Sequence, residues 1–262
     1  MQKSVFVTGG TNGTGYAIAR RFAKEGYAVM IGSRNGEAAR EAAERLSAEY
    51  PVAAYGYETK IFDEENGKEI FAQIRKNGYL LDTLVLNAAN LGIGQESLTV
   101  DMADFMRVLE TNVGWNFMMA RNAAQQMKEK HSGAIVFITS NSALRVTKDR
   151  CAYCASKSAI LAMSKSFAVD WGVYGIRSNC VLPGMIKTAR WEQNLNDCRY
   201  SLPNYTPIGD IADFEDIANA AYFLGSEQAK NITGAELAVD GGMLAQLVPD
   251  QSRRLAWDDR TN

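Results

Sequence analysis

The sequence holds few of the residues from which metal and disulfide sites are built. Its 262 residues include one histidine, four cysteines and five prolines. A tetrahedral zinc site takes four ligands, and the chain offers only His131 beside one pair, Cys151-x-x-Cys154. Four cysteines without a secretory signal also argue against a disulfide scaffold. We therefore expect no metal and no structural disulfide, and we expect these cysteines and His131 to be ordinary structural or surface residues.

Neither sign of charge dominates, and long apolar runs are missing. Lysine and arginine number 28 against 30 acidic residues, so the net charge is −2. This balance gives no basic surface for nucleic acid and no cationic face for an anionic membrane. No stretch approaches the roughly 18 apolar residues that span a bilayer, and the apolar run 5–7 is too short for a signal peptide. We therefore expect a soluble, cytoplasmic protein. Its 47% of hydrophobic residues are enough to form a sizeable core.

Short β-branched runs alternate with longer segments of helical period. The runs are continuously apolar, as in strands that are covered on both faces. Such alternation predicts an α/β fold with a parallel sheet and right-handed crossovers. Strands are expected at 5–7, 28–31, 83–86, 135–139, 178–182 and 237–239, and helices at 13–24, 37–49, 64–77, 101–130, 153–173 and 214–225.

A glycine-rich loop, residues 8–15 (TGGTNGTG), joins the first expected strand to the first expected helix. Glycines let a backbone approach a pyrophosphate closely, while N–H groups at the helix N-terminus face the anion. A Walker A loop is excluded, because Tyr16 and Ala17 follow where lysine and serine or threonine would stand. A purely structural turn is the alternative interpretation. If a dinucleotide binds, the expected contacts are Gly9, Thr11, Asn12, Gly13, Thr14 and Gly15.

The end of the second strand bears on the choice of dinucleotide. Proteins that bind NAD place an acid there for the ribose 2′-hydroxyl, whereas this chain has Ser33 and Arg34. A guanidinium is suited to a 2′-phosphate instead. The sequence therefore favours NADP(H). NAD(H) stays possible, because Asn12 in the glycine-rich loop offers no second positive charge for the 2′-phosphate.

Tyr153 and Lys157 are spaced to lie on one face of a helix. A free tyrosine has a pKa of about 10 and is a poor proton shuttle at neutral pH, but a nearby cation brings its pKa toward the working range. Ser140 follows the strand 135–139, at the carboxyl edge where α/β sheets bind ligands. The three residues therefore predict an acid/base site.

Together these residues resemble the short-chain dehydrogenase/reductase family, over nearly the whole chain. The glycine loop, Ser140, Tyr153 and Lys157 stand at that family's spacing, and Asn112 falls where it has a fourth catalytic residue. The resemblance implies one Rossmann-type, doubly wound parallel sheet of about seven strands with helices on both faces. Further family features are matched by Pro183-Gly184, Thr188, Gly234 and Asp240-Gly241-Gly242.

The resemblance also implies roles. Tyr153 would be the general acid/base, Lys157 would lower its pKa and bind the nicotinamide ribose, and Ser140 would donate to the developing oxyanion. Asn112 would hold a water that links Lys157 to solvent. Further cofactor contacts would come from Asn87, Ala88, Pro183, Gly184, Ile186 and Thr188.

Three departures from the family pattern concern the cofactor's adenine end and helix packing. Ala89 replaces a glycine, the acid usually found after the third strand has no clear match around 57–62, and Trp115 occupies a usual glycine position. We expect one domain over 1–246, with a substrate lid at about 187–210. The extension 247–262 would dock through Trp257 on a homodimer or homotetramer, the family's usual assemblies.

The leading hypothesis is an oxidoreductase that transfers a hydride between NADP(H) and a ketone or alcohol, a small molecule. The alternatives within this class are a 3-oxoacyl thioester reductase and a sugar or polyol dehydrogenase. A different class, a non-catalytic cofactor-binding sensor or scaffold, is disfavoured because Tyr153 and Lys157 are both present. Neither nucleic acid nor membrane is expected as a partner.

Overall fold

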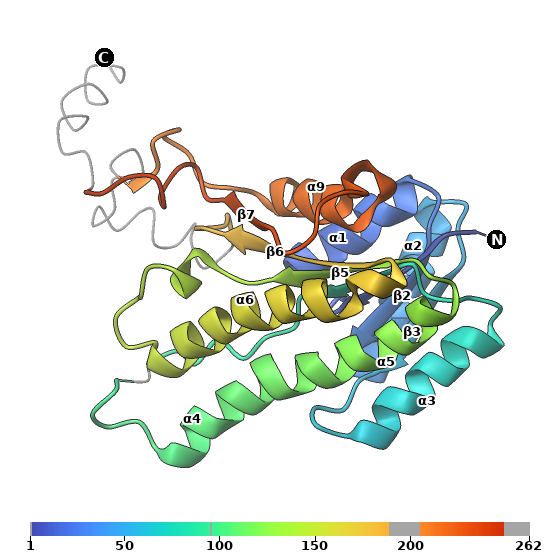
Figure 1. Ribbon diagram of the computed structural model, residues 1–262, viewed down its shortest axis with the longest axis horizontal. Coiled ribbons are helices and arrows are strands. Elements are labelled where there is room, and N and C mark those ends of the chain that lie inside the picture. The colour runs from blue at the N-terminus through green and yellow to red at the C-terminus, as the bar shows by residue number, and fades with distance from the viewer. Residues whose placement is uncertain (1, 95, 189–204, 249–262) are drawn as a thin grey trace.

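Seven parallel strands form one twisted sheet through the middle of the molecule (Figure 1). The computed structural model describes residues 2–94, 96–188 and 205–248. The spatial order is β3-β2-β1-β4-β5-β6-β7, which confirms the expected parallel, Rossmann-like sheet. The strands are β1 (Ser4–Thr8), β2 (Ala28–Ser33), β3 (Ala54–Glu58), β4 (Thr83–Leu86), β5 (Gly133–Ile138), β6 (Ile176–Pro183) and β7 (Glu236–Val239).

Helices cover both faces of the sheet (Figure 1). α1 (Gly13–Lys24), α2 (Gly36–Glu49) and α9 (Phe214–Gly225) build one hydrophobic core against it. The second core lies on the opposite face and includes α3 (Glu64–Lys76), α5 (Trp115–Glu129) and α6 (Cys151–Trp171). α4 (Met102–Leu109) leads into α5 and packs on α6.

Burial on both faces explains why the strands are apolar without interruption. In β1, Val5 and Val7 belong to the first core, while Phe6 between them belongs to the second. Successive side chains of a strand point to opposite faces of its sheet, so a strand buried between two helical layers needs an apolar residue at every position.

The chain reverses its direction of travel across the sheet at β1, which lies between β2 and β4. In open α/β sheets, ligands bind outside the carboxyl ends of the strands at such a switch point. The glycine loop follows β1 and Asn87 follows β4, so both lie at this edge.

Two expected elements differ from the structure. The edge strand β3 was not among the expected ranges, because its sequence AYGYE has no continuous apolar run. Its Gly56 is needed where β3 packs on α2, since a Cβ there would lie 2.3 Å from the backbone of Ala39. The helix expected over 101–130 is divided into α4, a π-helical turn at Glu110–Gly114, and α5.

Part of the expected substrate lid and most of the C-terminal extension lie outside the described residues, including Trp257 and Cys198. The two ends of the lid segment are described, and they are held together. The Lys187 ammonium lies 2.7 Å from the Asp210 carboxylate, and the Lys187 amide donates to the carbonyl of Ala212. Among the described helices, none is both long and apolar enough to cross a membrane.

Candidate active site

A cavity of about 780 Å³ opens at the carboxyl edge of the sheet. This volume lies in the range typical of small-molecule and cofactor sites. Of the residues expected to contact a cofactor, it brings together Gly9, Thr11, Asn12, Ser33, Arg34, Asn87 and Ala88. The rest of the lining comes from the segments after β3 and β4 and from the region of α4 and α5: Thr59, Ile61, Ala89, Asn90, Leu91, Arg107, Thr111 and Trp115.

The glycine loop lies tightly against the start of α1. A Cβ at Gly15 would come within 2.0 Å of the Gly9 carbonyl oxygen, so only glycine is accommodated without a shift. Asn12 is the N-cap residue of α1, yet its side chain makes no capping hydrogen bond. The first N–H groups of a helix have no intrahelical partners. The loop therefore has the geometry of an anion site.

The loop is also fastened to the end of β4. The Thr8 hydroxyl accepts the N–H groups of Asn87 and Ala88 at 3.0 and 3.2 Å. In return the Asn87 side-chain amide donates to the carbonyls of Thr8 and Gly9. The Asn87 amide nitrogen is thus used to brace the loop, while its residue still lines the cavity.

Arg45 supports the loop from α2, and the sequence reasoning missed it. Its guanidinium donates to the Thr11 carbonyl at 3.1 Å and lies over the ring of Tyr16, 4.9 Å from the centroid. No sequence motif marks this residue, because the contact joins segments 34 positions apart.

Arg34 is exposed at the end of β2 and lines the cavity. It makes no ion pair with any described residue, whereas Asn35 beside it caps α2 by accepting the N–H groups of Glu37 and Ala38. Ser33 accepts a hydrogen bond from the Asn35 amide at 3.2 Å. The guanidinium of Arg34 is therefore available to an anionic group in the cavity.

Tyr153 and Lys157 lie in the first two turns of α6, and both are nearly inaccessible. The Lys157 ammonium donates to the Ile138 carbonyl at the end of β5, at 2.9 Å, and lies 5.6 Å from the centre of the Tyr153 ring. Ser140 follows the same strand, so β5 and α6 together bring the three expected residues to one place.

Burial dominates the protonation equilibria of this group. It raises the pKa of the Tyr153 phenol above its ordinary value, although Ser140 and the Arg150 guanidinium oppose the change. It also lowers the pKa of Lys157 to about 8. The expected effect of Lys157 on the tyrosine pKa stays a prediction. Desolvation of the phenol prevails, and the opposing cation is Arg150.

Asn112 lies inside the π-helical turn and is fully buried. Its side chain accepts the Asn90 amide at 2.7 Å and donates to the Asn90 carbonyl and to the Ser156 hydroxyl. Both polar atoms of the side chain are thus bonded within the protein. Its main-chain carbonyl, which accepts the Asn116 side chain at 2.7 Å, is the atom left for the expected relay water, and that role stays a prediction.

The remaining expected contacts follow β6 at the same edge. The Gly184 amide donates to the Val239 carbonyl, and a Cβ at Gly184 would lie 2.7 Å from the Cβ of Asp240. Ile186 forms an isolated parallel bridge with Ala212. Pro183, Gly184, Ile186 and Thr188 do not line the cavity described above.

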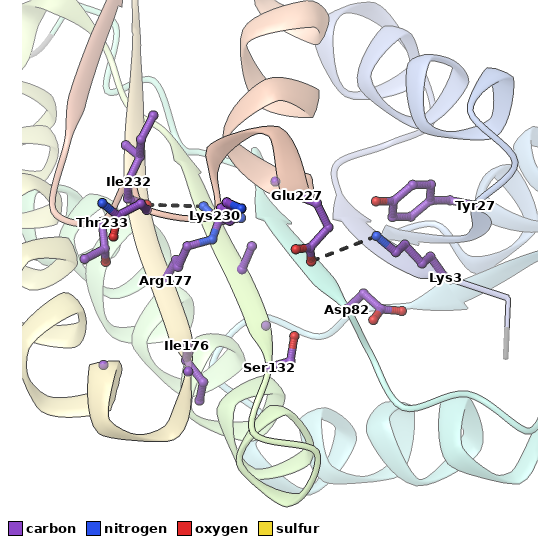
Figure 2. A pocket seen from close by; sticks show the side chains of 16 residues that line it. Lys3, Tyr27, Asp82, Ser132, Ile176, Arg177, Glu227, Lys230, Ile232 and Thr233 are labelled. Atoms are coloured by element: carbon purple, nitrogen blue, oxygen red, sulfur yellow. Dashed lines mark hydrogen bonds and ion pairs between the residues drawn. The ribbon is translucent and has the colours of Figure 1, made fainter.

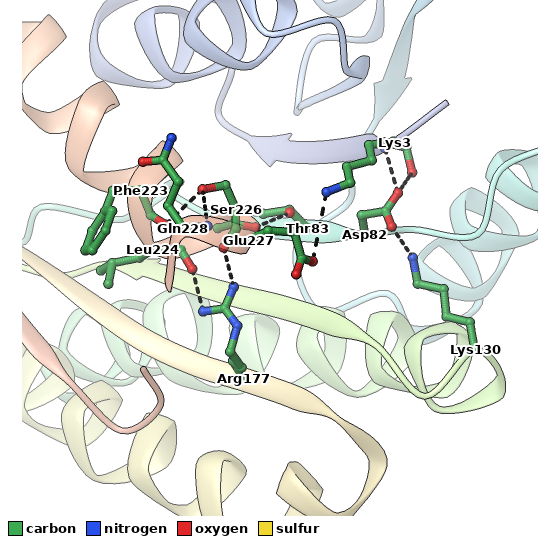
Figure 3. Close-up of polar contacts among 12 residues, drawn as sticks. Lys3, Asp82, Thr83, Lys130, Arg177, Phe223, Leu224, Ser226, Glu227 and Gln228 are labelled. Atoms are coloured by element: carbon green, nitrogen blue, oxygen red, sulfur yellow. Dashed lines mark hydrogen bonds and ion pairs between the residues drawn. The ribbon is translucent and has the colours of Figure 1, made fainter. Parts of the chain in front are cut away.

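A second cavity, of about 270 Å³, lies at the amino ends of the strands (Figure 2). The Arg177 guanidinium lines it and donates to the carbonyl oxygens of Leu224 at 2.7 Å and Ser226 at 2.9 Å, at the end of α9, and of Ile232 at 3.2 Å, in the segment before β7 (Figures 2 and 3). Nearby, Lys130 pairs with Asp82 (Figure 3). These charges hold the fold together, so the carboxyl edge is the better candidate site.

Comparisons with known proteins agree with this geometry. The family model described as Enoyl-(Acyl carrier protein) reductase matches residues 9–244. The chain is 34% identical over 244 residues to 3-oxoacyl-(acyl-carrier-protein) reductase FabG of Rickettsia bellii, covering 92% of this chain and 97% of that protein. It is 33% identical over 257 residues to L-rhamnose 1-dehydrogenase (NAD(P)(+)) of Azotobacter vinelandii, covering 94% and 98%.

Among solved structures, gluconate 5-dehydrogenase from Burkholderia cenocepacia, in complex with NADP and tartrate, superposes with a TM-score of 0.88 at 26% identity. The match covers 94% of this chain and 97% of that one. Fold and sequence therefore point to the same group of proteins.

Proposed function

Because this chain belongs to the short-chain dehydrogenase/reductase family of oxidoreductases, we propose that it interconverts a ketone and an alcohol with NADP(H) and uses Tyr153 as general acid/base. The observation that carries this proposal is the placement of Tyr153, Lys157 and Ser140 at the end of β5. That edge of the sheet also holds the anion-binding loop and its cavity.

The residues of the cavity fit a phosphorylated dinucleotide. The glycine at position 15 lets the loop pack closely on the start of α1, since a Cβ there would lie 2.0 Å from the Gly9 carbonyl oxygen, and the uncapped start of α1 suits a pyrophosphate. Arg34, which has no ion-pair partner within the described part of the chain, suits a 2′-phosphate. When bound, the nicotinamide supplies the hydride chemistry, and the protein positions and protonates the substrate.

Each residue of the group has one task in the reduction. Ser140 donates to the carbonyl oxygen as negative charge develops there. Tyr153 delivers its phenolic proton to that oxygen, and in the reverse direction removes it. The ammonium of Lys157 stabilises the phenolate that results and passes a proton to it, and a water on the Asn112 carbonyl then reprotonates Lys157 from solvent.

Loss of the phenolic hydroxyl tests this assignment. Tyr153→Phe keeps the buried ring and should lower turnover by about 10²–10⁴-fold with NADPH affinity little changed. Tyr27→Phe is the matched control, because Tyr27 is equally buried but lies at the opposite end of the sheet. Turnover is measured as NADPH oxidation over a panel of carbonyl compounds. A Tyr153→Phe enzyme within twofold of the wild type would refute the acid/base role.

The names of two relatives keep two substrate classes open within this function, a 3-oxoacyl thioester and a sugar or polyol. We place the choice between them in the segment 187–210, whose two ends are held together by Lys187 and Asp210. The same panel excludes the non-catalytic alternative if any carbonyl is reduced.

A further inference from the structure

Arg150 stands directly before α6, three residues ahead of Tyr153. Its guanidinium carbon lies 4.3 Å from the centre of the Tyr153 ring. Among the described residues, it forms no ion pair, and its buried Nε has no hydrogen-bond partner. Five other arginines have carboxylate partners, and those that lack one differ from Arg150 in having no buried, unpartnered nitrogen among the described residues.

The buried Nε of this half-buried guanidinium is in an unfavourable environment, because its N–H has lost water without gaining an acceptor among the described residues. Stacking on the ring holds the planar fork in one orientation, so its N–H groups form a fixed, two-pronged donor. Such a fork matches a carboxylate or phosphate oxygen pair. The group is also close enough to the phenol to influence its proton.

On the basis of the function proposed above, we propose that Arg150 binds an anionic group of the substrate, and that this enzyme prefers carbonyl compounds carrying a carboxylate or phosphate a few bonds from the reacting carbon. The anionic group must lie only a few bonds from the reacting carbon, because the guanidinium is so close to the catalytic ring. A remote anion at the end of a long acyl carrier would not reach both the guanidinium and the Tyr153 hydroxyl.

The tests compare charged and uncharged versions of one substrate. The wild type should reduce an aliphatic keto acid with a kcat/KM roughly ten- to hundredfold above that of its methyl ester, the range of a charge-assisted hydrogen bond. Arg150→Gln should remove this preference by raising KM for the acid while the ester changes less than threefold. Arg150→Lys, which keeps the charge but not the fork, should retain part of it.

Arg145→Gln is the matched control. Arg145 lies in the same loop between Ser140 and Tyr153 and is exposed, and among the described residues its guanidinium donates only to the neighbouring Leu144 carbonyl. It should leave both substrates unchanged. Malonate, which cannot be reduced, provides a binding readout: calorimetric titration in the presence of NADPH should give binding to the wild type and at least tenfold weaker binding to Arg150→Gln.

The outcomes separate this proposal from the general function. If the wild type treats acid and ester alike, or if Arg150→Gln lowers both equally, then Arg150 acts on Tyr153 or the fold and the proposal is wrong. Repeating the titration with inorganic phosphate tells a phosphate-bearing substrate from a carboxylate-bearing one. If no uncharged carbonyl and no keto acid is reduced, it is the proposed function that fails, whatever malonate does.

Discussion

Gly15 in α1 packs so closely on Gly9 that a Cβ at position 15 would lie 2.0 Å from the Gly9 carbonyl oxygen and 2.7 Å from the Asn87 amide nitrogen. Gly15→Ala must therefore displace the glycine loop or its brace. Overpacking of this kind costs about 1–3 kcal/mol. We expect a lower melting temperature and at least tenfold weaker NADPH binding, measured by fluorescence titration.

Gly172→Ala is the control for this prediction. Gly172 has helical backbone angles, and a Cβ there meets nothing within 4 Å. It should leave NADPH affinity unchanged and stability equal or slightly higher. Wild-type NADPH affinity in the Gly15→Ala protein would mean that the loop does not hold the pyrophosphate.

Much of the fold could be predicted from local patterns. α1 and α9 begin and end at the expected residues, because glycine breaks and an acidic first turn mark their boundaries in the sequence. β3 could not be predicted in this way. It lies at the edge of the sheet and is half-exposed, so it does not need a continuous apolar run. The π-helical turn within 101–130 depends on bonds from Asn112 to Asn90 and Ser156, which join distant segments.

Some features of the candidate site could likewise be predicted from the sequence, and others could not. Spacing alone predicted that Tyr153 and Lys157 share a helix face, and the structure places them there. The balance between burial and charge at the phenol could not be predicted, because it depends on how deeply α6 is covered. Arg150 was missed because it precedes the helix expected from residue 153, and its position over the Tyr153 ring depends on how the chain enters α6.

Arg34 tests the preference for NADP(H). Arg34→Asp replaces an exposed cation of the cavity with a charge that repels a 2′-phosphate. A charge-assisted pair contributes roughly 1.5–3 kcal/mol, so NADPH affinity should fall about ten- to hundredfold while NADH binds as well or better. Equilibrium titration with both cofactors measures this.

Arg40→Asp makes the same charge change on α2, at an exposed residue that does not line the cavity. It controls for the altered net charge and should change the NADPH to NADH affinity ratio by less than threefold. Equal NADPH affinity in wild type and Arg34→Asp would overturn the assignment of the 2′-phosphate.

Lys157 is fully buried, and desolvation lowers its pKa from 10.5 to about 8 in the folded protein. Below pH 8 both folded and unfolded chains hold the proton, so the folded state bears the whole cost of the buried charge. This cost is on the order of 3 kcal/mol. Between pH 8 and 10.5 the folded protein releases the proton while the unfolded chain keeps it, so this contribution makes the folded state more stable as pH rises.

Lys157→Met removes the titrating group and keeps an apolar stem of similar length. At pH 7 the variant should have the higher free energy of unfolding in urea, although it loses turnover because the phenolate has no ammonium beside it. Toward pH 10 the difference in stability should shrink, since the wild type then relieves its buried charge. A difference that is independent of pH, or a variant that is less stable at pH 7, would mean that the ammonium of Lys157 is fully compensated by its bond to the Ile138 carbonyl.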